Sequence, residues 1–194
     1  MTHTNAYSTG LDKNSANFVA LSPLSYLSRT AKVYPDRLAV IYGEQRQTWG
    51  QTYTRCCKLA GALAARGIGA GDTVAVMLPN VPAMLEVHFG VPMTGAVLNT
   101  LNTRLDAEAI CFMLQHGEAK VLLTDREFAP VIERALAMMG DKRPLVIEVE
   151  DDAAPAGKHL GEISYEAFLA QGDEQFAWTL PADEWDAISL SYTS

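Results

Sequence analysis

The clearest chemistry in this sequence is phosphate binding, and its candidates are two hydroxyl residues at the end of an apolar run. The run Ala187-Ile188-Ser189-Leu190-Ser191 favours a β-strand, and Tyr192-Thr193-Ser194 follows it. Short side chains after a buried strand let backbone N–H groups close around an anion. We therefore predict that Thr193 and Ser194 contact phosphate oxygens.

The histidines stand apart from one another in the sequence and predict no catalytic base. His88 lies in the mostly apolar stretch 85–89, where packing or an interface explains it better than catalysis. His116 precedes a glycine at a predicted helix end, where the helix dipole favours a cation. His3 and His159 fall in predicted loops without partners. We therefore predict no catalytic residue and no metal-binding cluster in this chain.

Three other polar residues allow two interpretations each. Asp125 follows an apolar strand, where open α/β sheets bind ligands, but it equally suits a helix N-cap before Glu127. Asn102 and Arg104 can hold their loop through side-chain hydrogen bonds, or they can touch a ligand. Polar loop residues bond mostly to backbone, so the loop-holding role is favoured for both.

Composition and charge exclude several classes of protein. The chain has 194 residues, 48% of them hydrophobic, which is enough to bury a core, and its formal net charge is -8. The scattered Lys and Arg do not form the basic surface that binds nucleic acid. No apolar run approaches the roughly 20 residues of a membrane span. Residues 1–17 are polar and carry no signal peptide, so we predict a flexible segment 1–17 and a cytoplasmic location.

The three cysteines predict buried free thiols rather than a disulfide or a metal site. They are Cys56, Cys57 and Cys111, an odd number with no zinc-type spacing.

Short β-branched runs alternate with helical periodicity from Pro35 onward, which predicts an α/β fold with a mostly parallel sheet flanked by helices. Residues 73–78 are apolar on both faces, as a central parallel strand requires. The acidic segment 150–157, with Pro and Gly, predicts a solvated loop. The predicted strands are 38–42, 46–48, 73–78, 96–98, 120–124, 144–149 and 187–192. The predicted helices run from Thr48 to Gly67 and over 82–93, 107–116, 128–139 and 165–170.

Capping residues support these helix limits. Thr48 with Gln51 three residues later forms a capping-box pattern, and Asp106 and Ser164 are predicted N-caps. Gly67 and Gly117 are predicted to end helices, and the terminal strand 187–192 is predicted to pair inside a larger sheet.

Several stretches of this chain resemble adenylate-forming enzymes, the superfamily of acyl-CoA synthetases, luciferases and peptide-synthetase adenylation domains. Tyr192-Thr193-Ser194 is similar to the opening of their Tyr-Thr-Ser-Gly-Thr-Thr-Gly-x-Pro-Lys-Gly signature. The stretch 90–105, with Gly95-Ala96 before a strand and Asn102-x-Arg104-Leu105 after it, resembles a helix-to-strand passage of acyl-CoA synthetases. Further matching stretches in the same order are 34–40, 48–49, 71–80 and 118–125.

The resemblance implies a two-step reaction. ATP and a carboxylate give an acyl-adenylate and pyrophosphate, and the thiol of CoA then displaces AMP to form a thioester. ATP, CoA and Mg²⁺ are the implied cofactors, and a short-chain, medium-chain or fatty acid is the implied substrate. Of the implied phosphate site only Thr193 and Ser194 lie in this chain. The resemblance therefore implies that 18–194 is the N-terminal portion of an AMP-binding domain, inactive on its own.

One alternative from a different class stays open on the residues alone. It is a free-standing nucleotide-binding or interaction module without catalysis, although no glycine-rich phosphate loop is complete in this sequence. An apolar surface left beside the terminal strand would favour association, so a homo-oligomer is a possible partner state.

Overall fold

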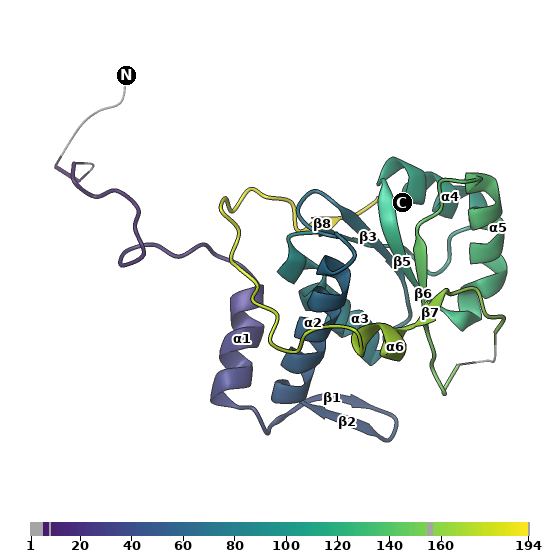
Figure 1. Ribbon diagram of the computed structural model, residues 1–194, viewed down its shortest axis with the longest axis horizontal. Coiled ribbons are helices and arrows are strands. Elements are labelled where there is room, and N and C mark those ends of the chain that lie inside the picture. Colours follow the sequence, from purple (N-terminus) through teal and green to yellow (C-terminus); the bar gives the residue numbers. More distant parts are fainter. Residues whose placement is uncertain (1–5, 8, 155–156, 194) are drawn as a thin grey trace.

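The computed structural model describes residues 6–7, 9–154 and 157–193 (Figure 1). In these residues a six-stranded sheet has the order β7-β6-β5-β3-β4-β8, and every neighbouring pair is parallel. A separate antiparallel hairpin precedes it, formed by β1 (Leu38–Tyr42) and β2 (Gln45–Thr48). The sheet strands are β3 (Thr73–Met77), β4 (Val97–Thr100), β5 (Ala119–Asp125), β6 (Leu145–Val149), β7 (Ile163–Ser164) and β8 (Ser189–Leu190). The predicted α/β fold with helices flanking a mostly parallel sheet is confirmed.

Helices cover both faces of the sheet (Figure 1). One face packs against α2, α3 and α6 through a core that includes Val74, Val76 and Leu123. The other face packs against α4 and α5 through a core that includes Ala75 and Leu122. A third apolar cluster joins α1 to the outer side of α2. The helices are α1 (Leu24–Val33), α2 (Trp49–Ala64), α3 (Pro82–Gly90), α4 (Ala107–His116), α5 (Ala129–Met139) and α6 (Tyr165–Leu169).

The central strand is β3, as its sequence predicts. All five of its residues are buried because helices cover it on both faces. After β3 the chain adds β4 on one side, and then crosses back over β3 to add β5 on the other side. The helix that follows β3, α3, therefore lies on one face of the sheet, and α4 and α5, which follow β4 and β5, lie on the other face. Where the strand order reverses in this way, the connections leave the sheet on opposite faces and open a crevice for ligands at the carboxyl edge of the strands.

Three predicted helix starts are confirmed by their hydrogen bonds. The Thr48 hydroxyl accepts from the Gln51 N–H, and the Gln51 side chain accepts from the Thr48 N–H, which completes the capping box. Asp106 accepts from the Ala109 N–H at 2.9 Å and begins α4. Ser164 caps α6 in the same manner.

One predicted helix end is wrong, and another is confirmed with an unexpected backbone conformation. The predicted helix 82–93 ends at Gly90, because Pro92 has no N–H to continue the ladder, and a short 3₁₀ turn (Pro92–Thr94) follows. After α4 the backbone of Gly117 keeps a negative φ, and Glu118 takes the left-handed conformation at φ 50°. Gly117 is close-packed instead, since a Cβ there would lie 2.9 Å from the Met113 carbonyl oxygen.

The terminal strand is shorter than predicted and lies at the edge of the described sheet. Only Ser189 and Leu190 pair with β4, opposite Leu98 and Asn99. Ala187 and Ile188 are exposed, because no described residue covers the outer side of β8. This agrees with the apolar surface that was predicted beside the terminal strand. The prediction that 187–192 pairs inside a larger sheet therefore holds for two residues and for one side.

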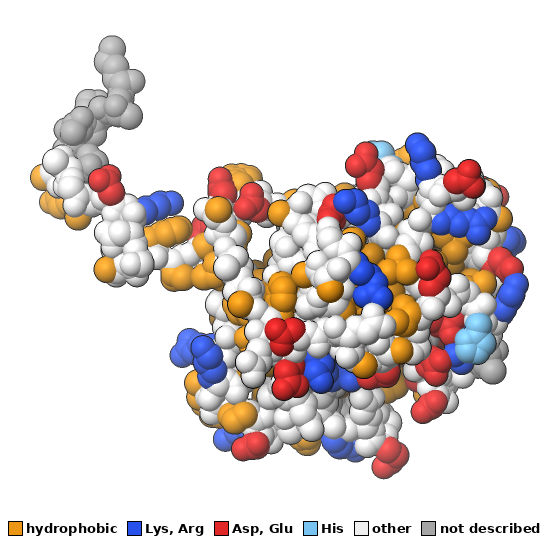
Figure 2. Space-filling view, viewed as in Figure 1, with side chains coloured by type: hydrophobic (Ala, Val, Ile, Leu, Met, Phe, Trp, Pro, Cys, Tyr) orange, Lys and Arg blue, Asp and Glu red, His pale blue; other side chains and the backbone are white. Residues whose placement is uncertain are grey.

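The segment before α1 leaves the body of the protein. Its described residues run outward without helix or strand (Figure 1), and they expose the apolar side chains of Leu11, Val19 and Leu21. Its contact with the body includes the Leu21 N–H, which donates to Glu184 at 2.6 Å. On the face shown in Figure 2, acidic and basic side chains are interspersed rather than gathered into a basic patch. In the part of the chain described here, no helix combines the length and the apolar character that a membrane crossing needs.

Candidate functional site

The candidate phosphate-binding residue Thr193 lies at the carboxyl edge of the sheet. β8 runs parallel to β4, so the residues after Leu190 emerge where the other sheet strands also end. Thr193 is exposed there, with its hydroxyl available to a ligand. Ser194, the second predicted phosphate contact, lies outside the described residues. The loop after β4 begins at the same edge, beside β8.

Asn102 holds that loop, as the favoured interpretation predicts. Its Oδ1 accepts from the Arg104 N–H at 2.9 Å, and its carbonyl accepts from the Leu105 N–H. The Arg104 side chain is exposed and makes no hydrogen bond or ion pair within the described chain. Arg104 therefore takes part in the loop through its backbone, and its guanidinium stays available at this edge.

Asp125 is the helix N-cap that the sequence allows. It ends β5, and its Oδ1 accepts from the Glu127 N–H at 2.9 Å. The side chain is buried, and its Oδ2 has no partner among the described residues. Burial raises the pKa of Asp125 above its ordinary value, and the nearby Asp151 adds to this effect. The capping contact explains the position of Asp125 without a ligand.

An acidic cleft of about 560 Å³ opens farther along the same edge, beyond β5. Its walls come from the β1–β2 turn, the start of α3, the end of β6 and the start of α6. The Tyr42 hydroxyl crosses it and donates to Asp151 at 2.5 Å, and this contact, with burial, raises the pKa of Tyr42 to about 12. Glu44, Glu150 and Asp152 also line the cleft. So much negative charge disfavours a phosphate ligand there.

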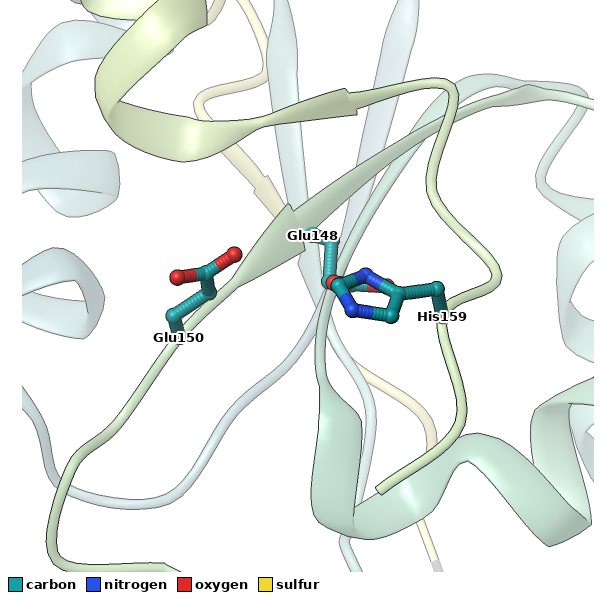
Figure 3. Close-up of side chains that lie close together, drawn as sticks. All are labelled: Glu148, Glu150 and His159. Carbon is teal, nitrogen blue, oxygen red and sulfur yellow. The ribbon is translucent and has the colours of Figure 1, made fainter. Parts of the chain in front are cut away.

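Three possible metal ligands meet beside this cleft (Figure 3), although the sequence predicts no such cluster. They are Glu148, Glu150 and His159, whose ligand atoms lie within 4.8 Å of one another. The guanidinium of Arg126, however, donates to both carboxylates. The positive charge of Arg126 already neutralises these carboxylates. The three side chains therefore fit an ion-pair network rather than a metal site.

Glu148 is the centre of that network. His159 was predicted to have no partner, but in the structure it contacts Glu148. The Nδ1 atom of His159 lies 3.0 Å from Glu148, and the Leu160 and Gly161 N–H groups donate to the second oxygen of Glu148. Burial would raise the pKa of Glu148, but Arg126 and the two N–H groups outweigh it and hold the pKa below its ordinary value. This network could not be predicted from the sequence, because its residues come from three separate segments of the chain.

One buried charged residue in the structure was not predicted from the sequence. Glu86 on α3 is fully buried, and its carboxylate accepts from Arg55 at 2.6 Å, Tyr165 at 2.8 Å and Gln47 at 3.1 Å. Its signal in the sequence is a single acid in an otherwise apolar helix. The neighbouring His88, for which packing or an interface was predicted, is exposed and contacts the carbonyl of its own helix at Met84.

The cysteine prediction is confirmed, and the His116 prediction is not. Cys56, Cys57 and Cys111 are free and buried. The Nδ1 atom of His116 lies 2.9 Å from the Tyr192 hydroxyl instead of capping its own helix. The helix ends without that cap because its terminal carbonyls accept backbone N–H groups from the turn at residues 117–118.

An all-parallel sheet with helices on both faces defines an α/β fold, the class of protein in which ligands bind at the carboxyl edge of the strands. The family of AMP-binding enzymes matches residues 27–194. This chain belongs to that family.

Curated relatives and solved structures agree with this assignment. The chain is 49% identical to acetate/butyrate–CoA ligase AAE7, peroxisomal, from Arabidopsis thaliana, and 46% identical to acetate–CoA ligase CCL3 from Humulus lupulus. Each match covers 95% of this chain and 34% of the relative. The chain thus spans about a third of the length of these relatives.

The fold is also that of solved CoA ligases. The anthranilate CoA ligase AuaEII, in complex with anthranoyl-AMP, superposes with a TM-score of 0.77 at 22% identity, over 94% of this chain and 34% of that one. The fatty acyl CoA synthetase of Mycobacterium tuberculosis gives a TM-score of 0.69 at 27% identity, over 88% and 32%.

Proposed function

We propose that this chain is the N-terminal part of an ATP-dependent acyl-CoA ligase that activates a short-chain or medium-chain carboxylic acid. The observation that carries the proposal is Thr193, which is exposed at the carboxyl edge three residues after the parallel strand β8 ends at Leu190. The relatives named as acetate and butyrate CoA ligases support a short acid as substrate.

The residues of this chain bind and orient rather than react. ATP supplies the adenylyl group that turns the carboxylate oxygen into a leaving group, and Mg²⁺ neutralises phosphate charge when it is bound. Thr193 fits phosphate binding because its hydroxyl and N–H lie at the open edge, away from the acidic cleft beyond β5. Ser194 is proposed to extend the same contact. The exposed Arg104 guanidinium leaves a positive charge at this edge.

The experiment that tests this function is acid-dependent exchange of pyrophosphate into ATP by the full-length protein. A panel of acetate, butyrate, hexanoate, octanoate, benzoate and cinnamate separates chain length from aromatic character. We expect exchange with at least one short acid, and formation of its thioester when CoA is added. Exchange that does not depend on any acid, or no exchange at all, would overturn the proposal.

A second measurement tests whether this chain is active on its own. The 194-residue chain alone is expected to form no thioester from ATP, CoA and the acid that the full-length protein accepts. Thioester formation by this chain alone would contradict the proposed role as one part of a larger catalytic unit.

Two further points of organisation belong to the same proposal. We assign 1–17 to a segment outside the packed domain 18–194, which is supported by the outward course of its described residues (Figure 1). The compartment is proposed to be the cytoplasm, although one of the relatives above is named peroxisomal. Microscopy of the full-length protein with a fluorescent tag on each terminus in turn distinguishes the two compartments.

A further inference from the structure

The residue before the candidate phosphate contact is fixed to the helix α4 by its ring and by its hydroxyl. The Tyr192 hydroxyl lies 2.9 Å from Nδ1 of His116 and donates to the Met113 carbonyl at 3.4 Å. The Tyr192 ring packs edge-on against His116 and Phe112, with centroid distances of 5.8 and 6.3 Å. One side chain thus joins the end of β8 to the last turn of α4.

His116 is itself held in one orientation. Its ring stacks on Phe112, one helical turn earlier, at a centroid distance of 5.3 Å and an interplanar angle of 19°. Residues four apart lie on the same face of a helix, so this stacking is built into α4. His116 therefore presents Nδ1 to Tyr192 from a fixed position.

The backbone provides little additional restraint at this point. β8 pairs with β4 over two residues, and no described residue pairs with its outer side. Two ladder positions leave the direction of the following residues free. The contact of Tyr192 with His116 comes after the last ladder position and directly before Thr193, so it fixes the direction in which Thr193 leaves the sheet.

We propose that His116 is a positioning residue for the phosphate site, acting through Tyr192 on Thr193. The inference rests on the proposed function, because it assigns a role within the same site. His116 and Phe112 are exposed, and Tyr192 is only half-buried, so the contact adds little to the core. Its removal changes the placement of Thr193 more than the stability of the fold.

The test is a double-mutant cycle in the full-length protein, with His116→Phe, Tyr192→Phe and the double variant. Each single change keeps an aromatic ring and removes one side of the hydrogen bond. His116→Asn is the conservative variant, since its amide reaches close to the position of Nδ1 and can donate or accept. His88→Phe is the matched control, because His88 is exposed on α3 and its hydrogen bond among the described residues is to Met84 in its own helix.

Two readouts are measured on each variant. The first is the KM for ATP and the kcat in acid-dependent pyrophosphate exchange. The second is hydrogen–deuterium exchange of peptides covering 187–193, which requires no activity. Melting temperatures confirm that the variants fold.

We expect each single variant to raise the KM for ATP about 3- to 10-fold, the range for one neutral hydrogen bond, with kcat changed less than twofold. Tyr192→Phe also removes the 3.4 Å bond to the Met113 carbonyl, so the double variant should match Tyr192→Phe. His116→Asn should return the KM to within about twofold of wild type, and His88→Phe should change nothing. Hydrogen–deuterium exchange of the peptides covering 187–193 should accelerate by a similar factor in His116→Phe and in Tyr192→Phe.

The inference and the proposed function fail separately. Unchanged exchange at 187–193, or a double variant whose effect is the product of the two single effects, would overturn the role of His116. If wild type shows no pyrophosphate exchange, the proposed function fails, and hydrogen–deuterium exchange still decides whether His116 orders Thr193.

Discussion

The Arg55 guanidinium and the Glu86 carboxylate lie 2.6 Å apart, and the Glu86 side chain is completely shielded from solvent. Burial alone would lower the pKa of Arg55, but its hydrogen bonds to Glu166 and Glu86 raise it above the ordinary value. The pair joins α2 to α3, and Tyr165 adds α6 to the same carboxylate. These three helices cover one face of the sheet, so a single buried acid links them all.

Glu86→Ala is expected to destabilise the protein by about 1–3 kcal/mol for each buried group left unpaired, because the Tyr165 hydroxyl and the Gln47 amide lose their acceptor, whereas Arg55 keeps Glu166. The measurement is urea unfolding followed by circular dichroism. Glu174→Ala is the control, since Glu174 forms a 3.5 Å pair with Lys58 at the surface and its loss should cost less than about 1 kcal/mol. Equal losses for the two variants would contradict the argument.

Glu148→Gln is expected to lower stability at pH 7 by about 1.5–3 kcal/mol, through weaker hydrogen bonds with Arg126 and the backbone N–H groups. The pKa of Glu148 is held below its ordinary value, so its contribution is present above the unfolded-state pKa and is lost as pH falls through the folded-state pKa. Unfolding curves of wild type and variant should therefore converge on acidification below about pH 4. A difference that stays constant from pH 7 to pH 3 would rule out this origin.

Thr193→Val removes one hydroxyl at nearly constant size. If that hydroxyl contacts an ATP phosphate, the loss of a hydrogen bond to a charged group is worth about 1.5–3 kcal/mol, or roughly 10- to 150-fold in ATP affinity. The measurement is the KM for ATP and the adenylation rate of the full-length protein. Thr179→Val, at an exposed position of the linker before β8, is the control. Unchanged affinity and rate in Thr193→Val would exclude the contact.

Gly117→Ala is expected to cost about 1–3 kcal/mol from overpacking, although its backbone conformation accepts any residue. The added Cβ would lie 2.9 Å from the Met113 carbonyl oxygen and 3.2 Å from a Leu190 methyl group on β8. Gly69→Ala is the control, because its nearest contact would be an ordinary 3.7 Å. Thermal unfolding compares the two, and a neutral Gly117→Ala would show that β8 can shift away.

Local signals predicted the fold well because they act within a few residues. The capping box at Thr48 and the cap at Asp106 fix helix starts through bonds between near neighbours, and the apolar run of β3 reports burial on both faces. The edge position of β8 was not predictable in this way. Burial of Ile188 depends on which segment covers the far side of the strand, and the composition of residues 187–192 does not contain that information.

The candidate site was predicted in part for the same reason. The sequence pointed to Thr193 through its place after a strand, but the contacts of Tyr192 and Glu148 join residues far apart in the chain. Glu86 was overlooked because a single acid in an apolar helix carries no mark of its partners. Pairings between distant segments become visible only when the fold brings them together.

The pairing of Leu98 with Ser189 has a consequence for the order of folding. β3, β4 and β5 follow one another along the chain and can assemble as soon as their connecting helices form. β8 is separated from its partner β4 by nearly half of the sequence. Its docking therefore closes the longest loop in the described sheet and carries the largest loss of chain entropy. The strand that leads to Thr193 is thus expected to be the last to dock during synthesis, which would leave the nucleotide edge unfinished until the rest of this sheet has formed.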